Sequence, residues 1–246
     1  MENLRVEKNI INNKINKNDF VDGFKKGIPI GLGYISVSIT FGMIATRGGI
    51  DILDAVLISM TNLTSAGQFA GVDLILSGAM YLEIALTTFI INIRYSLMSF
   101  AISQKLQKTS LIKRMIIAFG ITDEAYTLAS VEKGSISDKF MLGLITFPYI
   151  GWALGTFIGA VSTEFMSLEL QDALGIALYG MFLAIIIPAG KKDKGILKSV
   201  ILAGILSVGF FYLPILNKVS SGFALIICSL LAAHIMAKIM PIKEEE

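Results

Sequence analysis

Charged residues fall in short clumps along this chain, and the windows between the clumps are almost uncharged over about 18–25 residues. A helix needs a window of that length to cross the ~30 Å hydrocarbon core of a bilayer. Only 16% of the residues are charged, against about 25% in soluble domains. The alternating ~10-residue segments of an outer-membrane barrel are absent. The pattern predicts an all-α polytopic membrane protein with lipid around it and no nucleic acid as a partner.

Six windows predict full transmembrane helices, at 27–46, 82–103, 140–160, 173–189, 196–213 and 219–237. Two further segments, 53–79 and 111–131, are ambiguous because polar residues interrupt them. We expect them to be re-entrant or broken helices; if both cross instead, the chain has eight spans. The predicted domains are a cytoplasmic N-terminal tail at 1–26, a single transmembrane transport domain at 27–237, and a cytoplasmic C-terminal tail at 238–246.

Lysine and arginine accumulate in the cytoplasmic loops of membrane proteins, near the ends of the spans. With a cytoplasmic N-terminus and two re-entrant segments, 18 of the 21 basic residues lie inside. Arg47 and Lys218 then lie outside, and Arg94 lies within the membrane. If both segments cross, the basic loop 104–114 lies outside and the inside count falls to 14. Charge therefore favours six spans, and both interpretations place the two termini in the cytoplasm.

Glycines are spaced four residues apart at Gly151, Gly155 and Gly159, and again at Gly27 and Gly31. This spacing lets two helix backbones approach closely in lipid. We therefore expect the 151–159 ridge to pack against another helix.

The segment TNLTSAGQFAGVD, residues 61–73, places several polar side chains inside an apolar stretch. Lipid cannot satisfy polar groups, so such a cluster must face protein or a water-filled cavity. Its glycines and hydroxyl side chains weaken a helix, and we expect a break near 65–67. Half-helix ends at a break attract a substrate carboxylate; the alternative is a polar helix–helix interface. The candidate substrate-binding residues here are Asn62, Thr64, Ser65, Gly67 and Gln68.

Asn92 and Arg94 form a second polar cluster and are also candidates for substrate binding. A central arginine costs roughly 2.5–3.5 kcal/mol on insertion scales, so it needs an anion or water. Either Asp123 or Glu124 is a structural partner for Arg94, or Arg94 binds the substrate carboxylate directly. The choice stays open at the level of the sequence.

Acidic residues at Asp73, Asp123 and Glu124 are candidates for proton or ammonium coupling. A carboxylate at membrane depth could take up and release a proton. Adjacent helical positions point about 100° apart, so Asp123 and Glu124 should face different surroundings. The competing interpretation is a pair of acids at a helix start, with Thr122 as the N-cap.

The chain has a single cysteine, Cys228, and a single histidine, His234. These numbers exclude an internal disulfide, a cysteine metal motif and a histidine zinc site, and no phosphate-binding loop of the GxxxxGK[ST] kind is present. We expect no cofactor, no metal and no enzymatic activity. An intramembrane aspartyl protease using Asp73 and Asp123 lacks the expected flanking glycines. A passive channel for small polar solutes and a purely structural subunit remain alternatives to a secondary transporter.

Four motifs in this order resemble the AzlC family, the large subunit of bacterial branched-chain amino acid exporters. They are GIPIGLGYISVSITFGMIA (27–45), TSAGQFA (64–70), NIRYSLM (92–98) and TDEAYTLA (122–129). The resemblance covers about residues 20–240. Departures from the family pattern at Ser65, Ala66, Gly67 and Tyr95, where a histidine is common, bear on substrate preference.

The resemblance implies a multi-pass protein of the bacterial cytoplasmic (inner) membrane. It implies a secondary transporter that exports branched-chain or similar hydrophobic amino acids. It also implies a small partner membrane protein of the AzlD type.

Overall fold

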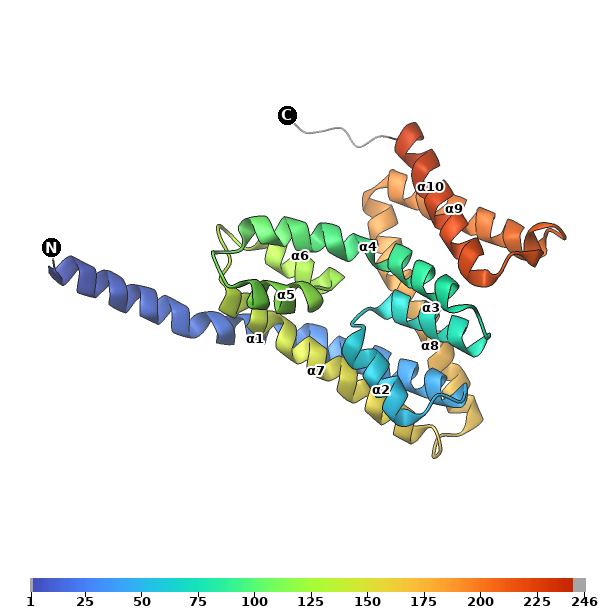
Figure 1. Cartoon of the computed structure of the whole chain (residues 1–246), viewed down its shortest axis with the longest axis horizontal. Coiled ribbons are helices and arrows are strands. Elements are labelled where there is room, and N and C mark those ends of the chain that lie inside the picture. The colour runs from blue at the N-terminus through green and yellow to red at the C-terminus, as the bar shows by residue number, and fades with distance from the viewer. Residues whose placement is uncertain (1, 241–246) are drawn as a thin grey trace. The chain divides into compact units, whose positions relative to one another are not determined.

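The computed structural model describes residues 2–240, with side chains from residue 19 onward except at several positions between 168 and 185. Within this range, every secondary-structure element is a helix (Figure 1). Among the residues whose side chains are described, five helices are long and apolar enough to cross a membrane, at Asp19–Arg47, Tyr81–Lys105, Asp138–Ser162, Lys194–Tyr212 and Ser221–Ile239. The chain divides into two compact units, Met1–Ser65 with Asn92–Met166 (unit 1) and Ala66–Ile91 with Ser167–Glu246 (unit 2).

Unit 1 is built on two long helices, α1 (Glu2–Arg47) and α7 (Asp138–Ser162), which lie side by side (Figure 1). The shorter helices α2 (Ile52–Thr61), α5 (Leu111–Phe119) and α6 (Asp123–Val131) pack on α7. The second half of α4 (Tyr81–Lys105) completes the unit.

Glycine makes the close approach of α1 and α7 possible. A Cβ atom on Gly151 would lie 2.8 Å from the carbonyl oxygen of Gly31, and one on Gly159 would overlap the backbone of Ile39. Gly155 meets the backbone of Ile35 in the same way. The expected packing role of the 151–159 ridge is therefore confirmed, and its partner is α1.

Unit 2 contains α3 (Ser65–Leu76) from its second residue, the first half of α4, α8 (Leu168–Lys192), α9 (Lys194–Tyr212), a 3₁₀ turn (Leu216–Lys218) and α10 (Ser221–Ile239). Helices α9 and α10 form an antiparallel hairpin (Figure 1). No residue of α9 is buried, and its exposed side chains include Ile201, Ile205 and Phe211. An apolar helix exposed in this way suits a lipid environment.

Both ambiguous segments are broken helices. The first consists of α2 and α3, and the second of α5 and α6, with Gly120–Thr122 between them. Apolar residues of α5 and α6, among them Ile117 and Ala125, form a buried core with Met141 and Leu144 of α7.

The two ends of the α5–α6 segment lie together. The backbone N–H of residue 107 donates to the carbonyl of Ile136 (2.9 Å), and that of Ile136 donates to the carbonyl of Lys105 (2.8 Å). Asp138, at the start of α7, accepts from Thr109 (2.8 Å) and pairs with Lys113 (2.6 Å). The chain therefore enters and leaves this segment at one place.

Each of the six expected spans corresponds to one helix, although 196–213 extends one residue past the end of α9 and 219–237 starts two residues before α10. The 173–189 window lies in α8, several of whose side chains are outside the described residues. Helix α1 already begins at Glu2, so it includes most of the expected N-terminal tail. The expected C-terminal tail, 238–246, lies outside the described residues from 241 onward. The single transport domain at 27–237 stays a prediction, because α3 and α4 are shared between the units.

Gly159→Ala should destabilise the protein, because the new methyl group meets the α1 backbone, which cannot move aside as a side chain can. Overpacking of this kind typically costs about 1–3 kcal/mol. We expect a clear fall in the melting temperature in detergent, and fluorescence-detected size exclusion measures it. Gly204→Ala in α9 is the matched control, since a Cβ there meets nothing within 4 Å; equal melting temperatures would contradict the packing role.

Candidate functional site

The break between α2 and α3 lies at Asn62–Thr64, one turn before the expected position at 65–67. Asn62 leaves the helical region (φ −137°, ψ 73°), and its carbonyl accepts from the N–H of Thr64 (2.7 Å). Residues 65–67 instead form the first turn of α3. The prediction was wrong here because Gly67 lies in the first turn of α3. The backbone N–H groups of a first turn have no partner within the helix, so a glycine there interrupts no hydrogen bond of the helix.

Thr64 connects this break to α4. Its hydroxyl donates to Asn92 Oδ1 (2.7 Å), and the side chain is 4% exposed. The hydroxyl of the next residue, Ser65, is buried and has no hydrogen-bond partner among the described residues. The break thus holds one satisfied and one unsatisfied polar side chain, and a buried polar group of the second kind needs a partner.

Arg94 pairs with Asp123 rather than with its neighbour Glu124. The Nη2–Oδ2 distance is 3.0 Å, and each of the two side chains is about 40% exposed. The same Nη2 donates to the Tyr95 hydroxyl (3.1 Å), and the guanidinium lies over the Tyr95 ring, 4.8 Å from its centroid. Arg94 Nε is buried and has no hydrogen-bond partner in the described part of the chain. Of the two acids that the sequence offered, the structure selects Asp123.

Glu124 faces a different partner, as the ~100° separation of neighbouring helical positions predicts. It accepts a hydrogen bond from the hydroxyl of Tyr34 on α1, whose ring packs edge-on against Trp152 (5.2 Å between centroids). The two acids therefore connect α6 to α4 and to α1 within unit 1.

Asp123 and Glu124 are the first two residues of α6. Thr122 is its N-cap, with its hydroxyl accepting from the N–H of Ala125 (3.4 Å). The positive end of a helix dipole favours carboxylates in the first turn. At the other end, Lys105 donates to the carbonyls of Ser130 and Glu132 (2.7 Å each). Local capping thus fixes the orientation of Asp123 and Glu124.

The remaining predicted site residues are placed as follows. Asn62 is half-buried at the break, and Gly67 and Gln68 are buried in α3, where Gln68 is 1% exposed. Asp73 is exposed on α3. Gly67, Gln68 and Asp73 belong to unit 2, so their membership of one site with Arg94 stays a prediction.

Two polar residues escaped the sequence analysis. Tyr34 was missed because a tyrosine in an apolar span carries no charge to mark it. Glu83 is 3% exposed in the first turn of α4 and was missed because it stands at the edge of a span. A count of every ionisable residue within the expected spans, edges included, would have found Glu83.

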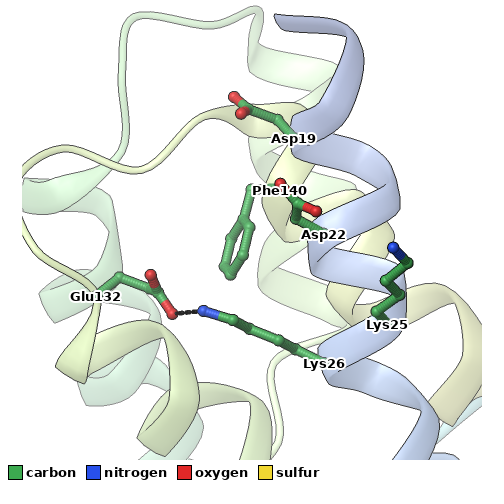
Figure 2. Close-up of a pocket in the computed structure, with 6 residues that line it drawn as sticks. All are labelled: Asp19, Asp22, Lys25, Lys26, Glu132 and Phe140. Atoms are coloured by element: carbon green, nitrogen blue, oxygen red, sulfur yellow. Dashed lines mark hydrogen bonds and ion pairs between the residues drawn. The ribbon is translucent and has the colours of Figure 1, made fainter. Parts of the chain in front are cut away.

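A cavity of about 400 Å³ lies beside α1, lined by Asp19, Asp22, Lys25, Lys26, Glu132 and Phe140. Figure 2 shows Lys26 reaching across to Glu132, with which it forms an ion pair. Its ammonium also lies 5.3 Å from the centroid of the Phe140 ring. None of the predicted site residues lines this cavity, and its charges join α1 to the turn after α6.

The arrangement around α4 offers opposite charges in contact, a part-buried amide–hydroxyl pair and, among the described residues, unsatisfied donors at Ser65 and Arg94. A cation and an anion that are partly exposed can each exchange the other for a ligand group of the same charge type. The site is therefore suited to a small zwitterion.

Comparison with known proteins places these observations in a family. The AzlC protein family matches residues 29–166. The chain is similar to the inner membrane protein YgaZ of Escherichia coli (29% identity, 89% of this chain and 91% of the relative). It is also similar to an uncharacterized membrane protein of Archaeoglobus fulgidus (31%, with 87% and 94% covered).

A third relative is the branched-chain amino acid transport protein AzlC of Bacillus subtilis, with 22% identity over 78% of each chain. No solved structure matches this chain. The family match contains the residues that build the polar cluster, from Tyr34 and Thr64 through Arg94 to Glu124. These matches and the five apolar helices long enough to span a bilayer establish that the chain belongs to the AzlC family of multi-pass membrane proteins.

Proposed function

We propose that this chain is a secondary transporter that exports branched-chain or similar hydrophobic amino acids across the cytoplasmic membrane. The observation that carries the proposal is the Arg94–Asp123 pair, which lies in the same unit as the Thr64–Asn92 contact at a helix break. Secondary transporters bind small charged substrates at such breaks.

The chemistry of an aliphatic amino acid fits these groups. Arg94 matches its carboxylate, and Asp123 matches its ammonium. An amino acid that inserts between them replaces one ion pair by two, so little charge is left unpaired in the membrane. Asp123 is then also the group through which a proton could compete with the ammonium.

The substrate class is supported by a relative and not by the geometry. The Bacillus subtilis relative is named a branched-chain amino acid transport protein. The proposal extends this substrate class to the present chain and adds a small AzlD-type membrane protein as its partner.

Contacts between helix ends support six full spans and a re-entrant α5–α6 segment. Backbone hydrogen bonds join residues 105–107 to residue 136, which supports a segment that returns to the side from which it started. In unit 2, Glu83 at the start of α4 accepts from the N–H of Gly222 at the start of α10. Those two starts share a side of the membrane only if an even number of spans separates them. Together with the basic loops, this favours cytoplasmic termini.

The test of the proposal is efflux of labelled leucine, isoleucine and valine from dipeptide-loaded cells. Cells would carry the chain alone or with a candidate small partner, with and without a protonophore. Efflux above the vector control that saturates and supports counterflow is expected of a transporter. Non-saturable flux without counterflow would instead indicate a passive channel for small polar solutes.

Asp123→Asn should reduce leucine export at least tenfold, because the amide keeps the shape of the side chain but can neither pair with an ammonium nor carry a proton. The measurement is initial efflux normalised to the amount of protein in the membrane.

Glu124→Gln is the control, since Glu124 contacts Tyr34 and not Arg94. The double variant Arg94→Gln/Asp123→Asn removes both charges and should restore any expression lost by the single variant while remaining inactive. Wild-type flux in Asp123→Asn would exclude its role in the site.

Lys108→Cys, made in a Cys228→Ala background, should resist an impermeant thiol reagent added from outside, because six spans place loop 104–114 in the cytoplasm. Phe165→Cys is the labelled control: its loop lies outside in both the six- and eight-span topologies, and both positions are exposed. Labelling of residue 108 in intact cells would refute the six-span topology.

A further inference from the structure

Glu83 is a buried acid to which the proposed function gives no role. It stands in the first turn of α4 and is 3% exposed. The ion pairs among the described residues do not include it. Its Oε1 accepts a hydrogen bond from the backbone N–H of Gly222 (3.0 Å), in the first turn of α10. An ionisable group kept in a membrane span without a basic partner calls for a function.

Thr87 lies one helical turn after Glu83, on the same face of α4. Its side chain is completely buried, and its hydroxyl has no hydrogen-bond partner among the described residues. A Cβ atom on Gly222 would lie 2.7 Å from both Glu83 Oε1 and Thr87 Oγ1. The carboxylate and the orphaned hydroxyl therefore converge on one point, which the α10 backbone can approach only because residue 222 is glycine.

Both the ionised and the protonated form of Glu83 find hydrogen-bond partners at this point. The carboxylate accepts the Gly222 N–H at the positive end of the α10 dipole. A protonated Glu83 gains an O–H donor, and the unpartnered Thr87 oxygen is an acceptor for it. Oε1 can keep the Gly222 hydrogen bond in either state.

We propose that Glu83 is the residue that takes up the coupling proton from the outer water; this rests on the proposed export function. In the six-span topology, the starts of α4 and α10 face outside, where protons enter as the amino acid leaves. The step is a simple protonation of the carboxylate, reversed later in the cycle. A metal ion fits poorly, because hard divalent cations take six or more oxygen ligands, and here a backbone N–H points at the carboxylate.

Among the described residues, few titratable groups flank Glu83, and Tyr81 is the nearest in sequence on α4 itself. Lys218 precedes α10, Cys228, His234 and Lys238 lie on it, and Asp73 lies on α3. No described hydrogen bond or ion pair joins any of them to Glu83. A pH dependence that disappears with Glu83 therefore reports on Glu83 itself.

The test uses proteoliposomes containing the chain together with any partner that export requires. Leucine counterflow moves no net proton, whereas efflux driven by an imposed pH gradient requires one. Glu83→Gln keeps an oxygen that accepts from Gly222 but cannot titrate. It should retain counterflow within about twofold, lose at least tenfold of proton-driven efflux, and lose the dependence of efflux on outside pH.

Glu164→Gln, in the exposed loop after α7, is the matched control and should change neither assay. Thr87→Val removes the hydroxyl at nearly constant volume and should reduce proton-driven efflux several-fold while sparing counterflow. If Glu83→Gln does not fold, Thr87→Val is the deciding variant. An unchanged dependence of its efflux on outside pH then overturns the proposal.

Normal proton-driven efflux in Glu83→Gln overturns the proton role alone. Equal loss of both assays in a well-folded Glu83→Gln also overturns it, since that result assigns Glu83 to substrate passage or structure. Absence of leucine counterflow in the wild-type chain overturns the export function and this inference with it.

Discussion

A helix that ends within a bilayer exposes backbone groups that hydrocarbon cannot hydrogen-bond, and this constraint governs both helix breaks of unit 1. At Asn62–Thr64 the N–H of Thr64 donates to the carbonyl of Asn62 and its hydroxyl donates to Asn92, and at Gly120–Thr122 the Thr122 hydroxyl caps α6. Lys105 donates hydrogen bonds to two carbonyls at the C-terminal end of α6. The breaks are thus tied to α4, and the candidate site lies where α4 meets them.

Unit 1 combines a close-packed pair of helices with a polar one. Glycines at the α1–α7 contact leave no room for adjustment, so this pair is a rigid support. The support holds α6 through the core around Met141 and through Tyr34, which reaches Glu124. The ion pair that we assign to the substrate lies instead between α4 and α6, where Arg94 and Asp123 remain partly exposed. Rigidity and exchangeable charge are therefore carried by different helices.

Much of this could be read from the sequence, because lipid imposes simple rules. The apolar windows predicted the positions of the long helices, and the spacing of Gly151, Gly155 and Gly159 predicted a packed ridge. The break positions depended on local competition: Asn62 ends α2, while the glycine at 67 fits within the first turn of α3. The sequence could not predict which acid pairs with Arg94, because the choice between Asp123 and Glu124 depends on the angle at which α6 leaves its cap.

Long-range contacts explain the remaining misses. Tyr34 becomes a site residue only because α1 passes Glu124, which lies 90 positions away in the chain. Glu83 becomes a buried acid only because α10 covers it, 139 positions later. No pattern within one helix reveals either contact, although a buried charge in a span is a warning that such a contact exists.

The central claim is that the Arg94–Asp123 pair recognises both charges of an aliphatic amino acid. Its most direct test is the shift in melting temperature of the purified protein with leucine, compared with 3-methylbutylamine and 4-methylpentanoate, which each keep one charge. A ligand at 100 times its Kd stabilises the folded state by about 2.7 kcal/mol. We predict a shift with leucine alone, abolished by Asp123→Asn. Equal shifts with all three compounds, or an undiminished shift in the variant, would contradict the account.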